Sequence, residues 1–90
     1  MKIRDGFVLR QILNENVVVG EGNELVNFNK LMVLNDSATF LFNSLQPLDS
    51  FTTADIVELL LGEYQLDKDT ACRDAAKVTE EWRNVGLIVD

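Results

Sequence analysis

Few side chains in this sequence have the types and spacing that catalysis requires. The sequence contains no histidine, so the commonest general base is missing. Cys72 is the only cysteine, and a reactive thiol needs a cationic neighbour, whereas Arg73 points about 100° away around a helix. We therefore interpret Cys72 as a partly buried small hydrophobe and expect no enzyme activity.

The acidic residues and glycines are explained by structure more simply than by chemistry. The pair Glu80-Glu81 is typical of a solvated helix face, and Asp67-x-Asp69 of a helix N-terminus, where negative charge is favoured. Together with Asp74, the latter pair does not match the spacing of a calcium loop. Gly20-x-Gly22 lacks the third glycine and the following helix of a dinucleotide fingerprint. The sequence therefore predicts no metal ion and no cofactor.

Length and charge indicate one acidic globular domain over residues 1–90. Hydrophobic residues make up 47% of the chain and charged residues 26%, which is typical of a folded protein. Residues 1–45 carry four basic and five acidic side chains, whereas residues 46–90 carry four and ten. An acidic half repels phosphate backbones, so we expect no nucleic-acid partner. It favours a basic or amphipathic partner surface, although such charge also serves solubility alone.

Targeting signals are missing from the sequence. The N-terminus lacks the long apolar stretch of a signal peptide, and the longest apolar run is far shorter than the ~20 residues of a membrane span. A single cysteine cannot form an internal disulfide. We therefore expect a cytoplasmic protein that does not interact with membranes.

The first third of the chain has the pattern of strands. Residues 7–12 and 17–19 are apolar and β-branched, and the turn cluster 14–16 between them predicts a hairpin. Residues 25–28 fit either a bend or a short strand. Residues 30–34 are predicted to form the third strand.

The remainder has the pattern of three helices. Asn35, Asp36 or Ser37 is expected to cap the first helix, which ends before Pro47. Thr52 caps the second, with Asp55 completing a variant capping box, and Asp67 caps the third. Gly86 has the position of a left-handed C-cap. Each helix carries an apolar stripe, formed by Ala38, Leu41, Phe42 and Leu45, by Ile56, Val57, Leu60, Leu61 and Tyr64, and by Ala71, Ala75, Val78, Trp82 and Val85.

This order predicts an α+β fold, with a three-stranded antiparallel sheet followed by a three-helix bundle that is winged helix-turn-helix-like. Residues 87–89 are expected either to fold back as a strand or to pack on the sheet. Winged helices commonly bind DNA with a basic third helix. Here the third helix has no basic stripe, since it alternates the two signs of charge at Arg73, Lys77 and Arg83 and at Asp69, Asp74, Glu80 and Glu81.

The third strand supports a hypothesis of peptide binding. Its apolar run, Leu31 to Leu34, stops abruptly at Asn35, and the last strand of so small a sheet has an open edge to which a peptide can add. Lys30 is typical of an edge guard. If the third helix lies alongside, the strand and the helix form an apolar groove. The pattern equally allows these residues to fill the core, or the edge to pair with a second copy.

The stretch FNKLMVLNDSATFLFNSL resembles the segment G-x-x-x-LN-x-[ST]-A-x-x-[ILF]-[FW]-x-x-L of the PqqD-like proteins. These are the coenzyme PQQ synthesis protein D family, also called RiPP recognition elements. The end of the chain is similar to the family's D-x-x-x-[FL]-x-x-x-L-x-x-x-GL-[IL], with Asp74, Val78, Trp82 and Gly86-Leu87-Ile88 at the matching positions. The start, GFVLRQILNENVVVGEG, resembles its opening hairpin. Ala75 and Trp82 depart from the usual residues, which predicts a reshaped groove.

The resemblance implies an adaptor rather than an enzyme. Family members bind the leader segment of a ribosomally made precursor peptide and present it to a modifying enzyme, often a radical-SAM protein. The leader adds to the third strand and packs against the third helix. The peptide-binding residues implied here are Lys30, Leu31, Met32, Val33 and Leu34 on the strand and Cys72, Ala75, Val78, Thr79 and Trp82 on the helix. We expect a monomer or weak homodimer, with a winged-helix nucleic-acid-binding domain and a structural oligomerising domain as the alternatives.

Overall fold

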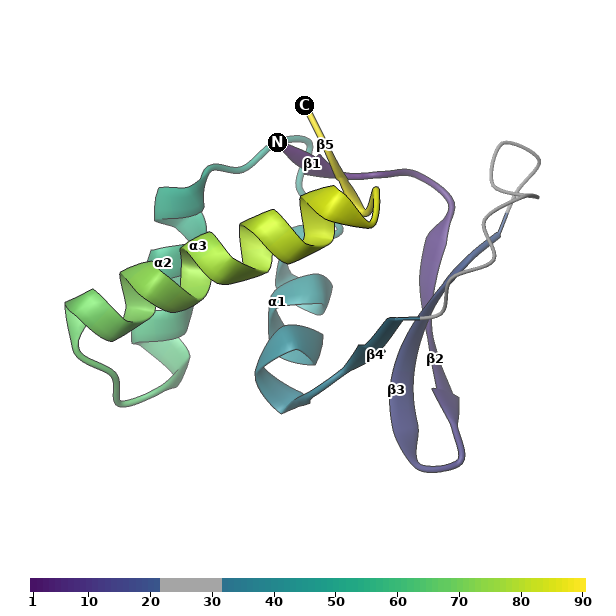
Figure 1. Cartoon of the computed structure of the whole chain (residues 1–90), viewed down its shortest axis with the longest axis horizontal. Coiled ribbons are helices and arrows are strands. Elements are labelled where there is room, and N and C mark those ends of the chain that lie inside the picture. Colours follow the sequence, from purple (N-terminus) through teal and green to yellow (C-terminus); the bar gives the residue numbers. More distant parts are fainter. Residues whose placement is uncertain (22–31) are drawn as a thin grey trace.

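The computed structural model describes residues 1–21 and 32–90, which form an α+β domain with a small sheet beside a group of helices (Figure 1). The predictions for residues 25–28 and for Lys30 and Leu31 lie outside the described residues. The elements, in chain order, are β1 (Lys2–Ile3), β2 (Phe7–Ile12), β3 (Glu15–Gly20), β4 (Met32–Leu34), α1 (Asp36–Leu45), α2 (Thr53–Glu63), α3 (Lys68–Asn84) and β5 (Ile88–Val89).

The predicted three-stranded antiparallel sheet is confirmed, in the order β2-β3-β4. Its hairpin turns at Leu13 and Asn14, whose φ angles are +50° and +68°, and not over the predicted cluster 14–16. A two-residue loop with both φ angles positive matches the twist of the flanking strands, so Glu15 and Asn16 are released for pairing within β3. The third strand lies at the edge of the described sheet, with Val33 opposite Val17.

Local capping begins α2 and α3 at the predicted residues, and α1 at Asn35, one of the three predicted candidates. The Asn35 side chain accepts a hydrogen bond from the Ala38 backbone N–H at 2.9 Å, directly after β4. Thr52 and Asp55 form a reciprocal capping box at the start of α2. Asp67 accepts from the Thr70 N–H at the start of α3. These caps satisfy backbone donors that a helix leaves free.

The core lies between one face of the sheet and the helices. Val18 and Leu34 supply the sheet side, and the stripes of the helices supply the other side, with Trp82 meeting Phe42 edge-on at a centroid distance of 6.4 Å. This confirms the helical stripes, since most of their members are buried. The fully buried members include Leu41, Phe42, Leu45, Ile56, Ala71 and Ala75.

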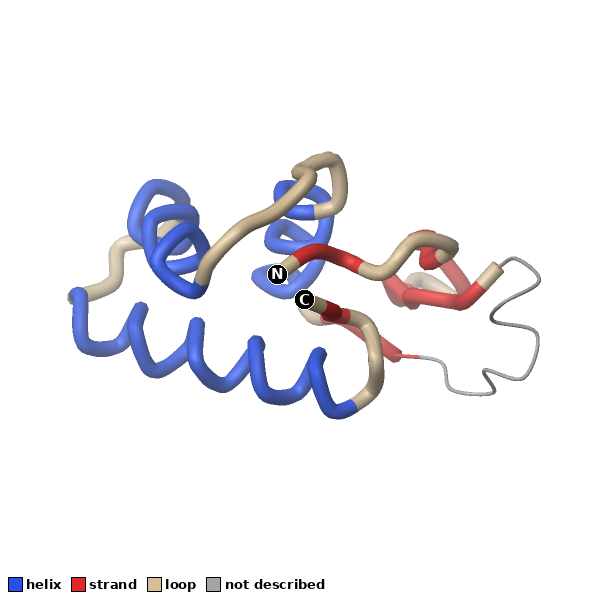
Figure 2. The backbone as a smooth tube through the Cα atoms, turned by 90° about the horizontal axis from the view of Figure 1, so that it is seen from above, coloured by secondary structure: helices blue, strands red, loops and turns tan. Residues whose placement is uncertain are grey.

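The two ends of the chain lie side by side (Figure 2). Of the residues 87–89, Ile88 and Val89 fold back as the strand β5, which agrees with one of the two predictions, and β5 pairs antiparallel with β1 in a separate two-stranded sheet. The Arg4 N–H donates to the Leu87 carbonyl at 2.8 Å and extends this ladder. The pairing fixes the end of α3 to the start of the chain.

Gly86 ends α3 with a φ of +83°, the predicted left-handed cap, and the Leu87 N–H donates to the Trp82 carbonyl at 2.8 Å. Gly86→Ala is expected to lower the free energy of unfolding by about 1 kcal/mol, because L residues disfavour this conformation. An added Cβ would meet only Arg4, at 3.9 Å, so the cost is conformational. Urea unfolding of both proteins measures it.

Gly62→Ala is the matched control. Gly62 lies in α2, and a Cβ there would meet nothing within 4 Å. This substitution is expected to raise the free energy of unfolding by about 0.5–1 kcal/mol through helix propensity. If both substitutions changed the free energy of unfolding in the same direction, the positive φ of Gly86 would not be the cause of the effect there.

Candidate functional site

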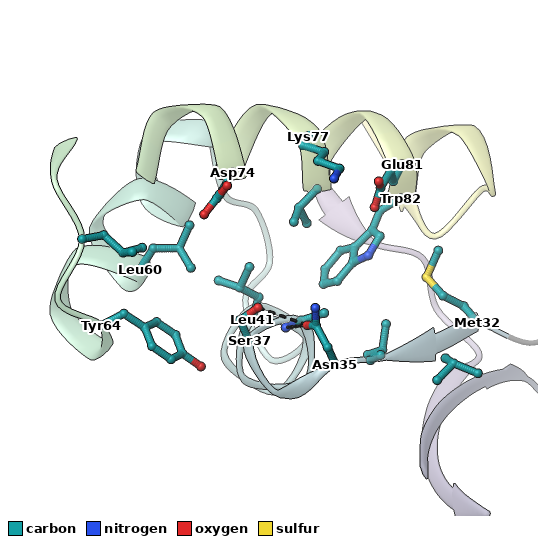
Figure 3. Close-up of a pocket in the computed structure, with 15 residues that line it drawn as sticks. Met32, Asn35, Ser37, Leu41, Leu60, Tyr64, Asp74, Lys77, Glu81 and Trp82 are labelled. Atoms are coloured by element: carbon teal, nitrogen blue, oxygen red, sulfur yellow. Dashed lines mark hydrogen bonds between the residues drawn. The ribbon is translucent and has the colours of Figure 1, made fainter. Parts of the chain in front are cut away.

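A groove runs between β4 and α3 and crosses the N-terminus of α1 (Figure 3). Its volume is about 450 Å³, whereas a water molecule in the liquid occupies about 30 Å³. The groove is therefore far larger than a packing defect. Met32, Val33 and Leu34 line one end of it, and Leu60, Tyr64 and Leu66 lie at the other.

The strand side of the groove combines core and exposed residues. Leu34 is 5% exposed and belongs to the core, Met32 packs partly against the core, and Val33 is 59% exposed. The strand therefore alternates, with Leu34 and Met32 toward the helices and Val33 away. The sequence pattern allowed this strand either to fill the core or to leave an open edge. Leu34 does fill the core, whereas β4 as a whole leaves an open edge in the described sheet. No strand in the described sheet pairs with the outer side of β4.

The floor of the groove is the surface of the hydrophobic core. Leu41 and Leu60 contribute side chains that are almost fully buried, and the Trp82 indole is only 2% exposed. Val78 on α3 and Ala38 on α1 are half-buried and complete the apolar lining. A ligand in the groove would thus contact a rigid, packed surface rather than a flexible loop.

The rim formed by α3 is charged. Asp74, Lys77 and Glu81 line the groove, and Figure 3 shows their side chains descending from α3 toward it. Spacings of three and four residues place them on one helical face, next to Val78 and Trp82. None of these three is among the site residues predicted from the sequence, although their periodicity with Val78 and Trp82 places them on the same helical face.

The α1 side of the rim is polar and uncharged. Asn35 caps α1 with its side-chain oxygen, and the Ser37 hydroxyl donates to the same oxygen at 3.1 Å. Both residues line the groove. Their polar groups are therefore already engaged in starting α1.

The predicted site residues are distributed unevenly over this geometry. Those that line the groove are Met32, Val33, Leu34, Val78 and Trp82. Ala75 is fully buried, and the Thr79 hydroxyl donates back to the Ala75 carbonyl at 2.8 Å, so neither lines the groove. Lys30 and Leu31 lie outside the described residues.

The prediction that Cys72 is partly buried is wrong, because this residue is exposed and does not line the groove. It follows the buried Ala71 by one position, and one residue turns the helix by about 100°, which carries the side chain off the stripe into solvent. Adjacency to a buried residue in the sequence was therefore misleading, because the angular position around the helix determines whether a side chain is buried.

Two further observations limit the chemistry of the described residues. Within residues 1–21 and 32–90, no three His, Cys, Asp or Glu side chains gather in a way that would hold a metal ion. The helices described in the structure include none with the length and apolar character to cross a membrane.

Comparison with known proteins gave a family and a fold. The family model described as Coenzyme PQQ synthesis protein D (PqqD) matches residues 13–88. TbiB1 in complex with the TbiA(beta) leader peptide has a similar structure, with a TM-score of 0.74, 22% identity and 100% of both chains covered. Lasso peptide synthetase B1 complexed with the leader peptide gives 0.69 and 24%, covering 99% of this chain and 96% of that one. No curated protein sequence matches.

The start of α3 beside Leu66 depends on Asp67, which generates a prediction for pH. Hydrogen bonds from the Thr70 side chain and backbone lower the pKa of Asp67 below its ordinary value of 3.8. A carboxyl whose pKa is lower when folded stabilises the protein above the unfolded value, and this stabilisation is lost as pH falls through the folded one. Asp67→Asn keeps a capping side chain but removes this titration.

Wild type is therefore expected to be more stable than Asp67→Asn at neutral pH, with the difference shrinking as the pH falls below 3.8. Thermal unfolding of both proteins between pH 2 and pH 7 measures the difference. Asp49→Asn, in the exposed loop after α1, is the control for a simple loss of negative charge. A difference that grows on acidification would contradict the capping role of the carboxylate.

Proposed function

The chain belongs to the coenzyme PQQ synthesis protein D family, and we propose that it is an adaptor that binds the leader segment of a ribosomally made precursor peptide. The observation that carries this proposal is the outer edge of β4, which no described strand covers and which opens onto the groove. Two proteins of similar fold are complexes with leader peptides.

The leader is proposed to bind by strand addition to β4. The outer edge of an edge strand presents backbone N–H and C=O groups that an extended peptide can pair with. Backbone pairing gives affinity with little sequence selection, because every residue supplies the same groups. We assign this role to Met32, Val33 and Leu34, and keep Lys30 and Leu31 as proposed contacts from the sequence.

Selection of the leader is proposed to come from α3 and the groove floor. Side chains alternate along an added strand, so every second leader residue faces Val78 and Trp82. We retain these two as helix contacts. Ala75 and Thr79 support the helix from outside the groove lining, and exposed Cys72 is assigned no contact with the leader.

A modifying enzyme is the second proposed partner, to which the adaptor presents the bound leader in the cytoplasm. The family resemblance favours an enzyme of the radical-SAM type, whereas one protein of similar fold is a lasso peptide synthetase B1. A second copy of the chain is the alternative partner that would pair with the same edge of β4. Sedimentation of the free protein distinguishes a paired edge from a monomer that leaves β4 open.

Titration of the ¹⁵N-labelled protein with leader segments of short peptides encoded beside its gene tests the proposal. Binding is expected at micromolar affinity or tighter, with amide shifts concentrated in β4 and between Asp74 and Trp82 on α3. No shifts with any neighbouring leader, in a protein whose spectrum shows that it is folded, would overturn the adaptor function.

Val33→Asp is expected to weaken leader binding by about tenfold or more. Val33 is 59% exposed, so the fold tolerates the change, but the added strand would leave a carboxylate partly desolvated without a partner. Isothermal titration calorimetry with the same leader measures the change in affinity. Ile12→Asp is the matched control, because Ile12 is also exposed, at 44%, and lies outside the groove lining. Equal losses in both variants would exclude the β4 edge as the binding surface.

A further inference from the structure

We propose that the groove selects a leader segment in which basic side chains flank an apolar one. This inference rests on the adaptor function and adds the chemistry of the peptide. It depends on the order of charged and apolar residues on the face of α3 that lines the groove. Asp74 and Glu81 lie seven positions apart on that face, with the apolar Val78 between them and the Trp82 indole of the floor directly after Glu81.

The spacing of the two carboxylates matches an extended peptide. Glu81 lies seven positions after Asp74, which is about 10 Å along the axis of α3. An extended chain advances about 3.3 Å per residue, and residues on one face recur at even spacing. Two basic residues that are two or four positions apart can therefore reach both carboxylates with their long side chains. The residues between them bring an apolar side chain to the floor.

The carboxylates are available for such a partner. In residues 1–21 and 32–90 the ion pairs are those of Lys2 with Asp5, Arg10 with Glu21 and Arg83 with Asp90, so neither groove carboxylate is paired. Lys77 lies between the two on the same face. None of the ion pairs in the described residues joins Lys77 to Asp74 or to Glu81. Lys77 therefore reduces the negative charge of the groove without forming an ion pair with either carboxylate.

The apolar floor strengthens the discrimination between basic and acidic peptides. A bound peptide covers Val78 and excludes water from the rim, and charges interact more strongly when the effective dielectric is lower. Complementary charge at the edge of an interface chiefly sets which partners are accepted. The acidic rim therefore rejects acidic leader segments, while strand addition to β4 supplies affinity to any extended peptide.

A displayed library of random 12-residue peptides, selected on the immobilised wild-type protein, tests this inference. The expected result is enrichment of Lys or Arg at positions two or four apart around an apolar residue. A synthetic peptide taken from that set is then titrated into variants. Glu81→Gln and Asp74→Asn are each expected to weaken binding roughly twofold to fivefold, the range of an exposed ion pair.

Two control variants distinguish a specific charge interaction in the groove from a general effect of net charge. Glu80→Gln removes the same charge from the neighbouring position, which does not line the groove, and is expected to leave the affinity unchanged. Lys77→Gln removes the positive charge from the groove and is expected to tighten binding of the basic peptide. A general effect of net charge would instead make Glu80→Gln and Glu81→Gln equivalent, which would overturn the inference.

The outcomes separate this inference from the adaptor function. Enriched peptides without a basic preference, or with one that Glu81→Gln leaves intact, would overturn the charge selection and leave peptide binding established. If the folded wild-type protein enriches no peptide at all, the groove is not a peptide site and both proposals fall. Circular dichroism of each variant confirms that the comparison is made between folded proteins.

Discussion

The groove depends on the size of one buried side chain, the Trp82 indole. It is almost fully buried and meets Phe42 edge-on, so it joins α3 to α1 while standing between α3 and the strand side of the domain. Toward the start of the helix the stripe carries Ala71 and Ala75, whose small side chains allow α3 to pack directly on α2. A helix held closely at one end and spaced by a large ring at the other leaves room beside β4.

The end of β4 has a local cause with a functional consequence. The strand ends at Leu34 because Asn35, the next residue, caps α1 and so starts a helix there. The groove continues past Asn35 and Ser37 toward Tyr64, so a peptide added to β4 can make contacts beyond the strand itself. The same junction thus positions the core helix and extends the binding surface.

Features that rest on local chemistry could be predicted from the sequence, as the caps at Asn35, Thr52 and Asp67 and the left-handed Gly86 show. The β1–β5 pair could not, because each strand is two residues long and its partner lies at the opposite end of the chain.

The candidate site was predicted on its apolar side only. An apolar stripe identifies residues that face the core, and it located Val78 and Trp82 correctly on the groove. The residues at the boundary of such a stripe are polar, so Asp74, Lys77 and Glu81 resembled ordinary solvated positions until α3 was placed against β4. The prediction that Cys72 is partly buried was wrong for the related reason that burial falls sharply within one step around the helix. Sequence periodicity therefore defines a helical face better than its edges, and the proposed charge selection depends on residues at those edges.

Burial of the groove floor determines where binding free energy comes from. Leu34, Leu41 and Trp82 are already hidden from water in the free protein, so covering them removes little further apolar surface. The gain from apolar burial must come mainly from Val33 and the half-buried Val78, and a few such side chains contribute modestly. Backbone pairing and rim charges then carry a larger share than in a deep pocket. A surface of this kind suits the proposed adaptor, because it would hold an extended segment selectively and still release it.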